Sequence, residues 1–237
     1  MIDHVRFQKI VHEAGRIAFS RWPGAGHILR SWDKEPGSPV SDADLEVDGF
    51  LRRELGRLLP SAGWLSEETV DDPVRLGMGL AWLVDPIDGT RDVFRGRPGW
   101  CVSVGLISEG RSLIGMLAAP ARAEEWLGIA GQGAWRNGER LAASTRAKFA
   151  GSRVPADVLP EADSDLTLVD KPNSIALRIA MVGADEADLL ATLRWGYEWD
   201  IAAATLIARE AGAMVSDAFG APLNFNKRDP RAFGLLV

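Results

Sequence analysis

Apolar residues spaced three or four positions apart predict helices near both ends of the chain. The pattern is clear over residues 5–19, 174–182 and 199–211, where one face of each helix would be buried. A further helix is expected to begin after Ser41, because Ser41 and Asp44 have the spacing of a capping box. Helices are therefore predicted on both sides of the middle of the chain.

The middle of the chain has the pattern of β-strands. Short apolar and β-branched runs occur at residues 81–84, 100–107, 111–120 and 124–141. Asn137-Gly138 is typical of a tight hairpin turn, so neighbouring strands are expected to pair antiparallel. Residues 31–40 carry two prolines and are predicted to form a loop. Helices arranged around an antiparallel sheet predict the α+β fold class.

The length and composition favour one domain. A chain of 237 residues is long enough to bury a sizeable core, and 46% hydrophobic with 25% charged residues is the profile of a globular protein. The composition changes after Leu141, which indicates a seam near residue 145. We expect a single domain over residues 1–237, with an α+β lobe at 1–144 and an α/β lobe at 145–237.

Charge and cysteine content exclude several classes of protein. The formal net charge is -6 and no basic run occurs, which argues against a nucleic-acid polymer as partner. No apolar run reaches membrane-spanning length and the N-terminal residues do not resemble a signal peptide, so we expect a cytoplasmic protein with no membrane partner. Cys101 is the only cysteine and the three histidines lie near the N-terminus, which argues against a zinc site.

The stretch "AWLVDPIDGTRDVF" places Asp85 and Asp88 directly after an apolar strand. Two like charges held close together cost stability unless something positive lies between them. An Asp-Pro turn followed by an Asp-Gly turn on the surface is the simpler interpretation. An EF-hand loop fails, because its twelfth position would be Gly96 rather than glutamate. Aspartyl-phosphate phosphatases have their aspartates two positions apart, whereas these are three apart.

Three other polar sites have simple structural interpretations when each is taken alone. Glu67 and Glu68 form an acidic pair that would normally be solvated. Asp200 begins an apolar helix, as an N-cap does, and Trp199 beside it is expected in the core. Lys34 would be an ordinary surface lysine. None of these residues identifies a function by itself.

Taken together and in order, these stretches resemble the inositol monophosphatase superfamily. The matching segments are Lys34 with "SPVSDAD", then "SEE", "DPIDGT" and "WDIAA", and they span most of the chain. The resemblance implies a layered αβαβα fold of the inositol monophosphatase and fructose-1,6-bisphosphatase type. It also implies a Mg²⁺-dependent phosphomonoesterase that holds two or three ions, with a homodimer as one assembly that the sequence leaves open.

The resemblance assigns roles to residues of this chain. It implies that the metal ligands are the side chains of Glu67, Asp85, Asp88 and Asp200 and the backbone carbonyl of Ile87. Catalytic roles would fall to Asp44, Glu67 and Thr90, with Asp44 and Thr90 positioning or deprotonating the attacking water. Contacts to the substrate would come from Asp88, Gly89, Thr90 and Asp200. Ser66 occupies a position that is usually glycine in the family, a small change that leaves Glu67 in place.

The substrate expected from the resemblance is a small phosphorylated metabolite, and "WLSEET" and "YEWDIAAATLIAREAGA" look most like the bacterial 3'(2'),5'-bisphosphate nucleotidase branch. Leu193 stands where animal inositol phosphatases have a glutamate that binds inositol hydroxyls. This favours 3'-phosphoadenosine 5'-phosphate over inositol 1-phosphate or another sugar or histidinol phosphate. Trp195 and Tyr197 are candidates for an adenine-binding wall, although at least one is expected to pack in the core.

Oxygen ligands alone suit Mg²⁺, which could activate a water and stabilise the leaving oxygen without a nucleophilic side chain. Two other classes stay open at this point. One is an aspartyl-phosphate phosphatase, which the aspartate spacing disfavours. The other is a non-catalytic protein of the same fold that binds metal or phosphate.

Overall fold

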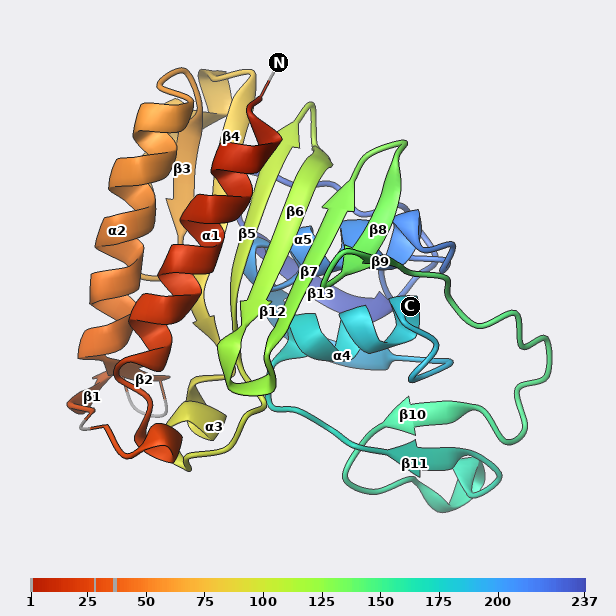
Figure 1. Cartoon of the computed structure of the whole chain (residues 1–237). Coiled ribbons are helices and arrows are strands. Elements are labelled where there is room, and N and C mark those ends of the chain that lie inside the picture. The colour runs from red at the N-terminus through yellow and green to blue at the C-terminus, as the bar shows by residue number, and fades with distance from the viewer. Residues whose placement is uncertain (1, 28, 36–37) are drawn as a thin grey trace.

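The computed structural model describes residues 2–27, 29–35 and 38–237, and for residues 33–35, 38 and 39 it describes the backbone alone. A seven-stranded sheet in the order β3-β4-β5-β6-β7-β8-β9 lies at the centre (Figure 1). Its strands are β3 (Gly63–Ser66), β4 (Leu80–Asp88), β5 (Cys101–Ser108), β6 (Arg111–Ala119), β7 (Glu124–Ile129), β8 (Gly133–Arg136) and β9 (Glu139–Arg140). Only β3 and β4 pair in parallel; every other neighbouring pair in this sheet is antiparallel, as predicted.

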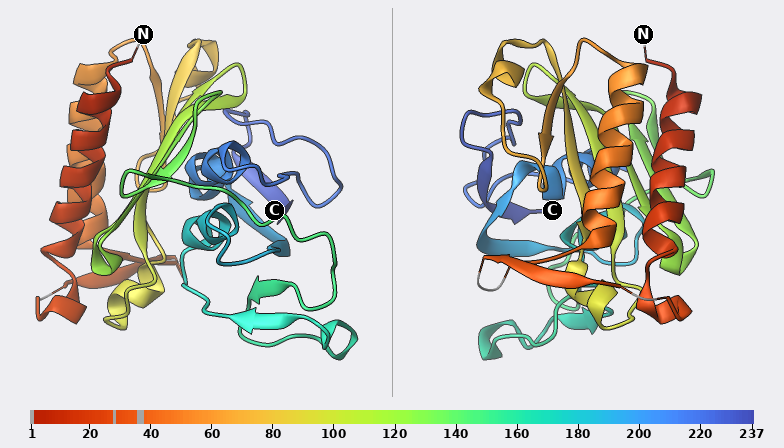
Figure 2. Two further views of the ribbon diagram at one scale, coloured as in Figure 1. Left: turned by 45° about the vertical axis from the view of Figure 1, so that its right-hand side comes forward. Right: turned by 90° about the vertical axis from the view of Figure 1, so that its left-hand side faces the viewer.

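Helices cover both faces of this sheet (Figure 2). Helices α1 (His4–Phe19) and α2 (Asp42–Leu58) pack side by side on one face, and α4 (Ile175–Gly183) and α5 (Glu198–Glu210) pack together on the other. The predicted helices and the layered α+β fold are thus confirmed. The predicted capping box at the start of α2 is also present, because Ser41 and Asp44 bond reciprocally.

The three small sheets lie outside this central stack. Strands β1 (Ser31–Glu35) and β2 (Ser38–Ser41) pair antiparallel, so the prediction of a loop there was wrong. Strands β10 (Arg153–Pro155) and β11 (Thr167–Val169) form a parallel pair, and β12 (Ala191–Tyr197) and β13 (Arg231–Leu236) an antiparallel pair beside α4 and α5. Short helical elements complete the fold: η1 (Pro23–Ala25), η2 (Pro73–Gly77), α3 (Thr90–Phe94), η3 (Pro120–Arg122) and η4 (Glu161–Asp163).

The core has two halves, one on each face of the central sheet. Alternate residues of β4 point to opposite sides, so Trp82 and Val84 join the cluster under α1 and α2 while Leu83 joins the cluster under α4 and α5. A strand buried on both faces is apolar throughout, which explains the unbroken run before Asp85.

Small residues let α5 lie directly on the sheet. A Cβ built on Gly115 of β6 would come within 2.7 Å of the Cα of Ala203 in α5. A larger side chain at either position would push the helix away from the sheet. This close packing fixes the N-terminal end of α5 near the carboxyl end of β4.

Candidate active site

The strand β4 continues through the two aspartates and does not end before them. The structure extends β4 to Asp88, beyond the predicted end at Val84, so both carboxylates are held by the central sheet. The backbone N–H of Ile87 donates to Oδ1 of Asp85 over 3.0 Å, and the hydroxyl of Thr90 donates to the Ile87 carbonyl over 3.0 Å. The "DPID" segment is therefore a buried, hydrogen-bonded part of β4 with a bulge between the aspartates, and not a surface loop.

Gly89 allows the chain to turn immediately after Asp88. Its φ is 97°, in the left-handed region that favours glycine, and it is the N-cap of α3. A Cβ there would lie 2.7 Å from the carbonyl oxygen of Gly99 and 2.9 Å from the backbone nitrogen of Ser174. The glycine thus brings three segments of backbone together beside the aspartates.

Asp88 links β4 to the beginning of α4. One of its carboxylate oxygens accepts hydrogen bonds from Ser174 Oγ at 2.5 Å and from the backbone N–H of Ala176 at 2.7 Å. Ser174 is the N-cap of α4 and also accepts from the N–H of Leu177. The role of Ser174 was missed in the sequence, although a serine directly before an apolar helix is an N-cap signal.

Asp200 comes from the far end of the chain. It is the third residue of α5, not its N-cap, and its Oδ2 accepts the backbone N–H of Tyr197 over 2.9 Å. Strand β12 runs straight into α5, so the same strand end that carries Tyr197 also fixes this carboxylate. Trp199 is buried, as predicted.

The acidic side chains influence one another electrostatically. The pKa of Asp85 is raised well above its usual range, first by burial and then by the negative charges of Glu67, Asp88, Asp200 and Asp44. The pKa of Asp200 is raised well above its usual value by burial and then by the charge of Asp88, and the pKa of Asp88 is raised chiefly by burial. Residues predicted to act together are thus brought together from α2, the end of β3, β4 and α5.

Asp44 lies at the start of α2, next to this acidic cluster. Burial raises its pKa to about 7, while hydrogen bonds from Ser41 act in the opposite direction. Its Oδ2 accepts the backbone N–H of Ser41 over 2.8 Å and the Ser41 hydroxyl over 2.5 Å. A carboxyl group with a pKa near neutrality can hold or release a proton under ordinary conditions.

The end of β3 is tied to α2 by a contact that sequence reasoning missed. The hydroxyl of Ser66 donates to buried Asp48, and Thr69 Oγ1 donates to the other oxygen of Asp48 over 2.8 Å. Ser66 is the residue that replaces the usual glycine of the family, so here the replacement gives a side-chain bond. Glu67 follows directly, and its backbone N–H donates to the carbonyl of Val84 over 3.3 Å. The side chain of Lys34 lies outside the described residues.

The donor set suits a hard divalent cation. Across residues 2–27, 29–35 and 38–237, no three acidic, histidine or cysteine side chains are already arranged around one cation position. The mutual charge effects nevertheless show that the carboxylates are neighbours, and every donor is oxygen. Oxygen-only sites with open positions favour Mg²⁺ over zinc or copper. The chemistry of the residues therefore fits the predicted metal.

A pocket of about 660 Å³ opens beside Asp200. It lies between β10 and the β12–β13 sheet, and Trp195 and Tyr197 line it. Their side chains are 64% and 42% exposed, so the prediction that at least one of them packs in the core was wrong. Tyr197 stacks on Trp199 with ring centres 4.4 Å apart, which holds its ring at the edge of the pocket.

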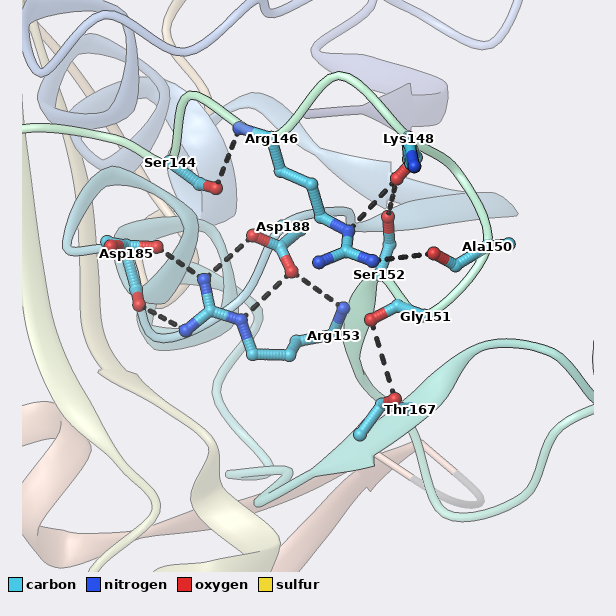
Figure 3. A network of polar contacts seen from close by, with 10 residues as sticks. All are labelled: Ser144, Arg146, Lys148, Ala150, Gly151, Ser152, Arg153, Thr167, Asp185 and Asp188. Carbon is cyan, nitrogen blue, oxygen red and sulfur yellow. Dashed lines mark hydrogen bonds and ion pairs between the residues drawn. The ribbon is translucent and has the colours of Figure 1, made fainter.

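The outer wall of the pocket is anchored by Arg153 (Figure 3). Its guanidinium donates to both carboxylate oxygens of Asp188, at 2.7 and 2.9 Å, and to the backbone carbonyl of Asp185 at 2.5 Å. These acceptors follow the end of α4, whereas residues 154–158 directly after Arg153 line the pocket. Hydrogen bonding from Arg153 also lowers the pKa of Asp188. One side chain thus connects the pocket wall to the body of the protein.

The fold and the acidic cluster define a class: α+β phosphatases whose site is built from carboxylates at the end of a central strand. The chain belongs to the Inositol monophosphatase family, which matches it over residues 3–235. It is therefore a metal-dependent phosphomonoester hydrolase, and enzymes of this family use Mg²⁺.

Individual relatives cover nearly the whole chain. A Thermotoga maritima protein named fructose-1,6-bisphosphatase/inositol-1-monophosphatase is 29% identical, covering 99% of this chain and 93% of its own. The solved structure of Thermotoga maritima IMPase is 26% identical, has a TM-score of 0.85 and covers 99% of this chain and 91% of its own. A 3'(2'),5'-bisphosphate nucleotidase CysQ of Aggregatibacter actinomycetemcomitans is 29% identical, covering 83% of this chain and 78% of its own.

The similar proteins do not single out the nucleotidase branch. Names with inositol monophosphatase are more frequent among them than nucleotidase names. The expected family is confirmed, whereas the expected branch is one of several to which the chain is similar. In the described part of the chain, no helix has the length and apolar character to cross a membrane.

Proposed function

We propose that the chain hydrolyses small polyol or sugar phosphates, of which inositol 1-phosphate is the simplest, with Mg²⁺ and water. The observation that carries this proposal is the convergence of Asp85, Asp88 and Asp200 next to a pocket of metabolite size. The names of most relatives favour a polyol or sugar phosphate over a nucleotide.

In this proposal the acidic cluster is the metal centre. Two or three Mg²⁺ ions would be held by Glu67, Asp85, the carbonyl of Ile87, Asp88 and Asp200. Bound Mg²⁺ would neutralise charge on the phosphate and make a water more acidic. The residues themselves would supply closely spaced, buried negative charges. A bound cation would relieve the repulsion between these charges, which favours its binding.

Thr90 and Asp44 would handle the proton of the attacking water. The Thr90 hydroxyl donates to the carbonyl of Ile87, which leaves its oxygen lone pairs to accept a hydrogen bond from water. Asp44, with a pKa of about 7, would take up a proton from that side of the site. The substrate phosphate would contact Asp88, Gly89, Thr90 and Asp200, with Gly89 allowing close approach of the backbone.

A bisphosphorylated nucleotide such as 3'-phosphoadenosine 5'-phosphate is the second candidate. The exposed rings of Trp195 and Tyr197 in the pocket favour it, because a base can stack on an aromatic side chain. Leu193, on the same strand, is 74% exposed and offers no hydrogen bond to a polyol. The similarity to a CysQ nucleotidase is also consistent with this substrate.

A phosphate-release screen tests both candidates. Inositol 1-phosphate, fructose 1,6-bisphosphate, histidinol phosphate and 3'-phosphoadenosine 5'-phosphate are compared with Mg²⁺ and with excess chelator, using wild type and Asp85→Asn. We expect turnover with Mg²⁺ that is lost with chelator and in the variant. Full turnover in metal-free buffer would contradict the proposed mechanism. A nucleotide that is cleaved best would instead establish the second candidate.

A further inference from the structure

Two arginines face the pocket from different elements. Arg178 comes from α4 and Arg194 from β12, and both line the pocket that contains Asp200. In the described part of the chain neither forms an ion pair with a carboxylate. Lys171, on the same pocket, differs because it is paired with Asp157. The two guanidinium groups therefore keep donors that no carboxylate of the described residues occupies in a direct ion pair.

Arg178 is held in place by backbone carbonyls and not by a direct ion pair. Its Nε and Nη2 donate to the backbone carbonyls of Ser174 and Asn173, each over 3.2 Å. A guanidinium has five N–H donors, so these bonds orient the group and leave other donors for a ligand. The residues it bonds are those at the start of α4 that also hold Asp88.

The surroundings of Arg178 show that Arg194 is near. Burial is the first cause of its lowered pKa; Asp88 and Asp157 act against this, and the positive charge of Arg194 adds to it. Arg178 thus lies within electrostatic reach of both the acidic cluster and Arg194. Two cations held near each other repel, and an anion placed between them removes that cost.

We propose that Arg178 and Arg194 form a subsite for a second anionic group of the substrate, a phosphate or a carboxylate, while the phosphate to be cleaved lies at the acidic cluster. The proposal rests on the proposed function, and it identifies small phosphomonoesters that carry a second negative charge as the preferred substrates within that class. Guanidinium groups suit this role because they bind oxyanions through paired N–H donors. A sugar bisphosphate or a bisphosphorylated nucleotide fills both places, whereas inositol 1-phosphate fills only the acidic cluster and would be a poorer substrate.

The test uses substrate pairs that differ only in the second phosphate. Fructose 1,6-bisphosphate is compared with fructose 1-phosphate, and 3'-phosphoadenosine 5'-phosphate with adenosine 3'-phosphate, in the presence of Mg²⁺. In at least one pair, wild type should favour the bisphosphate in kcat/KM by about tenfold or more. Arg194→Gln and Arg178→Gln should both remove most of this preference, and Arg194→Gln, which lies outside the contacts that hold Asp88, should change kcat/KM for the monophosphate by less than about threefold.

Arg52→Gln is the control, because Arg52 is an exposed arginine of α2, on the other face of the central sheet. It changes the net charge equally and should leave the preference intact. Arg194 is exposed, so its replacement tests the subsite even where the half-buried Arg178 variant fails to fold. Equal losses for both members of a pair in Arg194→Gln, or no preference in wild type, would overturn the subsite.

A binding experiment separates failure of the subsite from failure of the proposed function. Calorimetry with Ca²⁺ in place of Mg²⁺ measures the affinity of the same four compounds without relying on turnover. Tighter binding of the bisphosphates that depends on Arg194, with no turnover of any compound in Mg²⁺, would support the subsite and refute the proposed function. Turnover of monophosphates, together with equal affinity for both members of each pair, would support the proposed function and refute the subsite.

Discussion

The site has two ends, the acidic cluster and the pocket beside it, and they are built in different ways. The acidic end belongs mainly to β4, which is hydrogen-bonded on both sides within the seven-stranded sheet and buried on both faces. The opposite end belongs to the two-stranded sheets β10–β11 and β12–β13, and its aromatic side chains are exposed. The proposed chemistry thus lies on the most constrained part of the fold. The proposed recognition lies on parts that can change without disturbing the central core.

The two ends also have opposite charge. At the acidic end carboxylates raise one another's pKa, and at the other end Arg178 and Arg194 lie within reach of each other. Each end is destabilised by its own like charges in the absence of a ligand. A metal ion would relieve the repulsion among the carboxylates, and an anionic group would relieve the repulsion between the two arginines. The site as a whole therefore fits a substrate with two anionic groups, one bound through the metal and the other bound by the arginines.

Removing one charge from the acidic end should have the largest effect on activity. In Asp85→Asn we expect kcat/KM to fall by at least about a thousandfold, or ~4 kcal/mol, because a metal ligand is weakened. Without metal the variant should be at least as stable as wild type, since four neighbouring carboxylates lose a like charge. Phosphate release and thermal melts with chelator measure the two effects.

Asp88→Asn is the matched control for that stability argument. Asp88 accepts bonds from Ser174 and Ala176 at the start of α4, whereas Asp85 accepts a hydrogen bond from the nearby N–H of Ile87, within its own strand. We expect the Asp88 variant without metal to be less stable than the Asp85 variant by about 1 kcal/mol. An Asp85 variant that melts well below wild type would show that Asp85 is a structural residue.

The stability of the metal-free protein should depend on pH, because a buried carboxyl group of the acidic end has a raised pKa. The pKa of Asp44 is raised from 3.8 to about 7, so between these values the folded state binds more protons than the unfolded state. Protonation of Asp44 therefore makes its full contribution to stability below about pH 4, and this contribution is lost as the pH rises through 7. We expect unfolding free energy in chelator to fall by roughly 2–4 kcal/mol between pH 5 and pH 8.

Mg²⁺ and the Asp44→Asn variant provide the two checks on this prediction. Mg²⁺ should reduce the fall in unfolding free energy between pH 5 and pH 8, because cations favour the charged carboxylates. Asp44→Asn should make the unfolding free energy of the metal-free protein less dependent on pH. Denaturant titrations at both pH values measure the effect. Metal-free wild type that is more stable at pH 8 than at pH 5 would contradict the raised pKa.

The sequence predicted the acidic end well because its requirements are local. "DPIDGT" combines an apolar strand, two carboxylates and a glycine with positive φ, and each of these is visible in consecutive residues. The helix start at Ser41 follows from a capping pattern of the same kind. What remained hidden was that β4 continues through the aspartates, because a proline between them looks like a turn.

The opposite end could not be predicted because its contacts join distant segments. Arg153 reaches Asp185 and Asp188 more than thirty positions away, and nothing in the residues around it indicates that pairing. At least one of Trp195 and Tyr197 was expected to be buried, since large aromatic residues usually are. Their exposure follows from the position of β12 in a two-stranded sheet beside the pocket, which only the tertiary structure shows.

Loosening the outer wall should alter recognition more than chemistry. In Arg153→Ala the segment 154–158 loses its anchor to Asp185 and Asp188, so we expect KM to rise about tenfold while kcat changes by less than about threefold. Arg146→Ala is the control, because Arg146 bonds the carbonyls of Lys148 and Ala150 within its own loop (Figure 3). A fall in kcat with unchanged KM would place Arg153 in the chemistry.

The smallest expected effect comes from Leu193, which tests how finely the recognition end discriminates. The side chain is 74% exposed, so a polar replacement should not disturb folding. In Leu193→Glu a carboxylate becomes available to polyol hydroxyls and lies beside Arg194. A net hydrogen bond at an exposed site contributes ~0.5–1 kcal/mol, so kcat/KM for inositol 1-phosphate should rise about two- to fivefold.

The same negative charge should lower kcat/KM for fructose 1,6-bisphosphate, because it offsets the charge of Arg194. Leu193→Gln separates the two causes: it keeps the hydrogen-bonding capacity and should improve the polyol substrate without weakening the bisphosphate. Equal responses of both substrates to Glu and Gln would mean that residue 193 does not face the bound substrate, and the recognition end would then have to be assigned to other residues of the pocket.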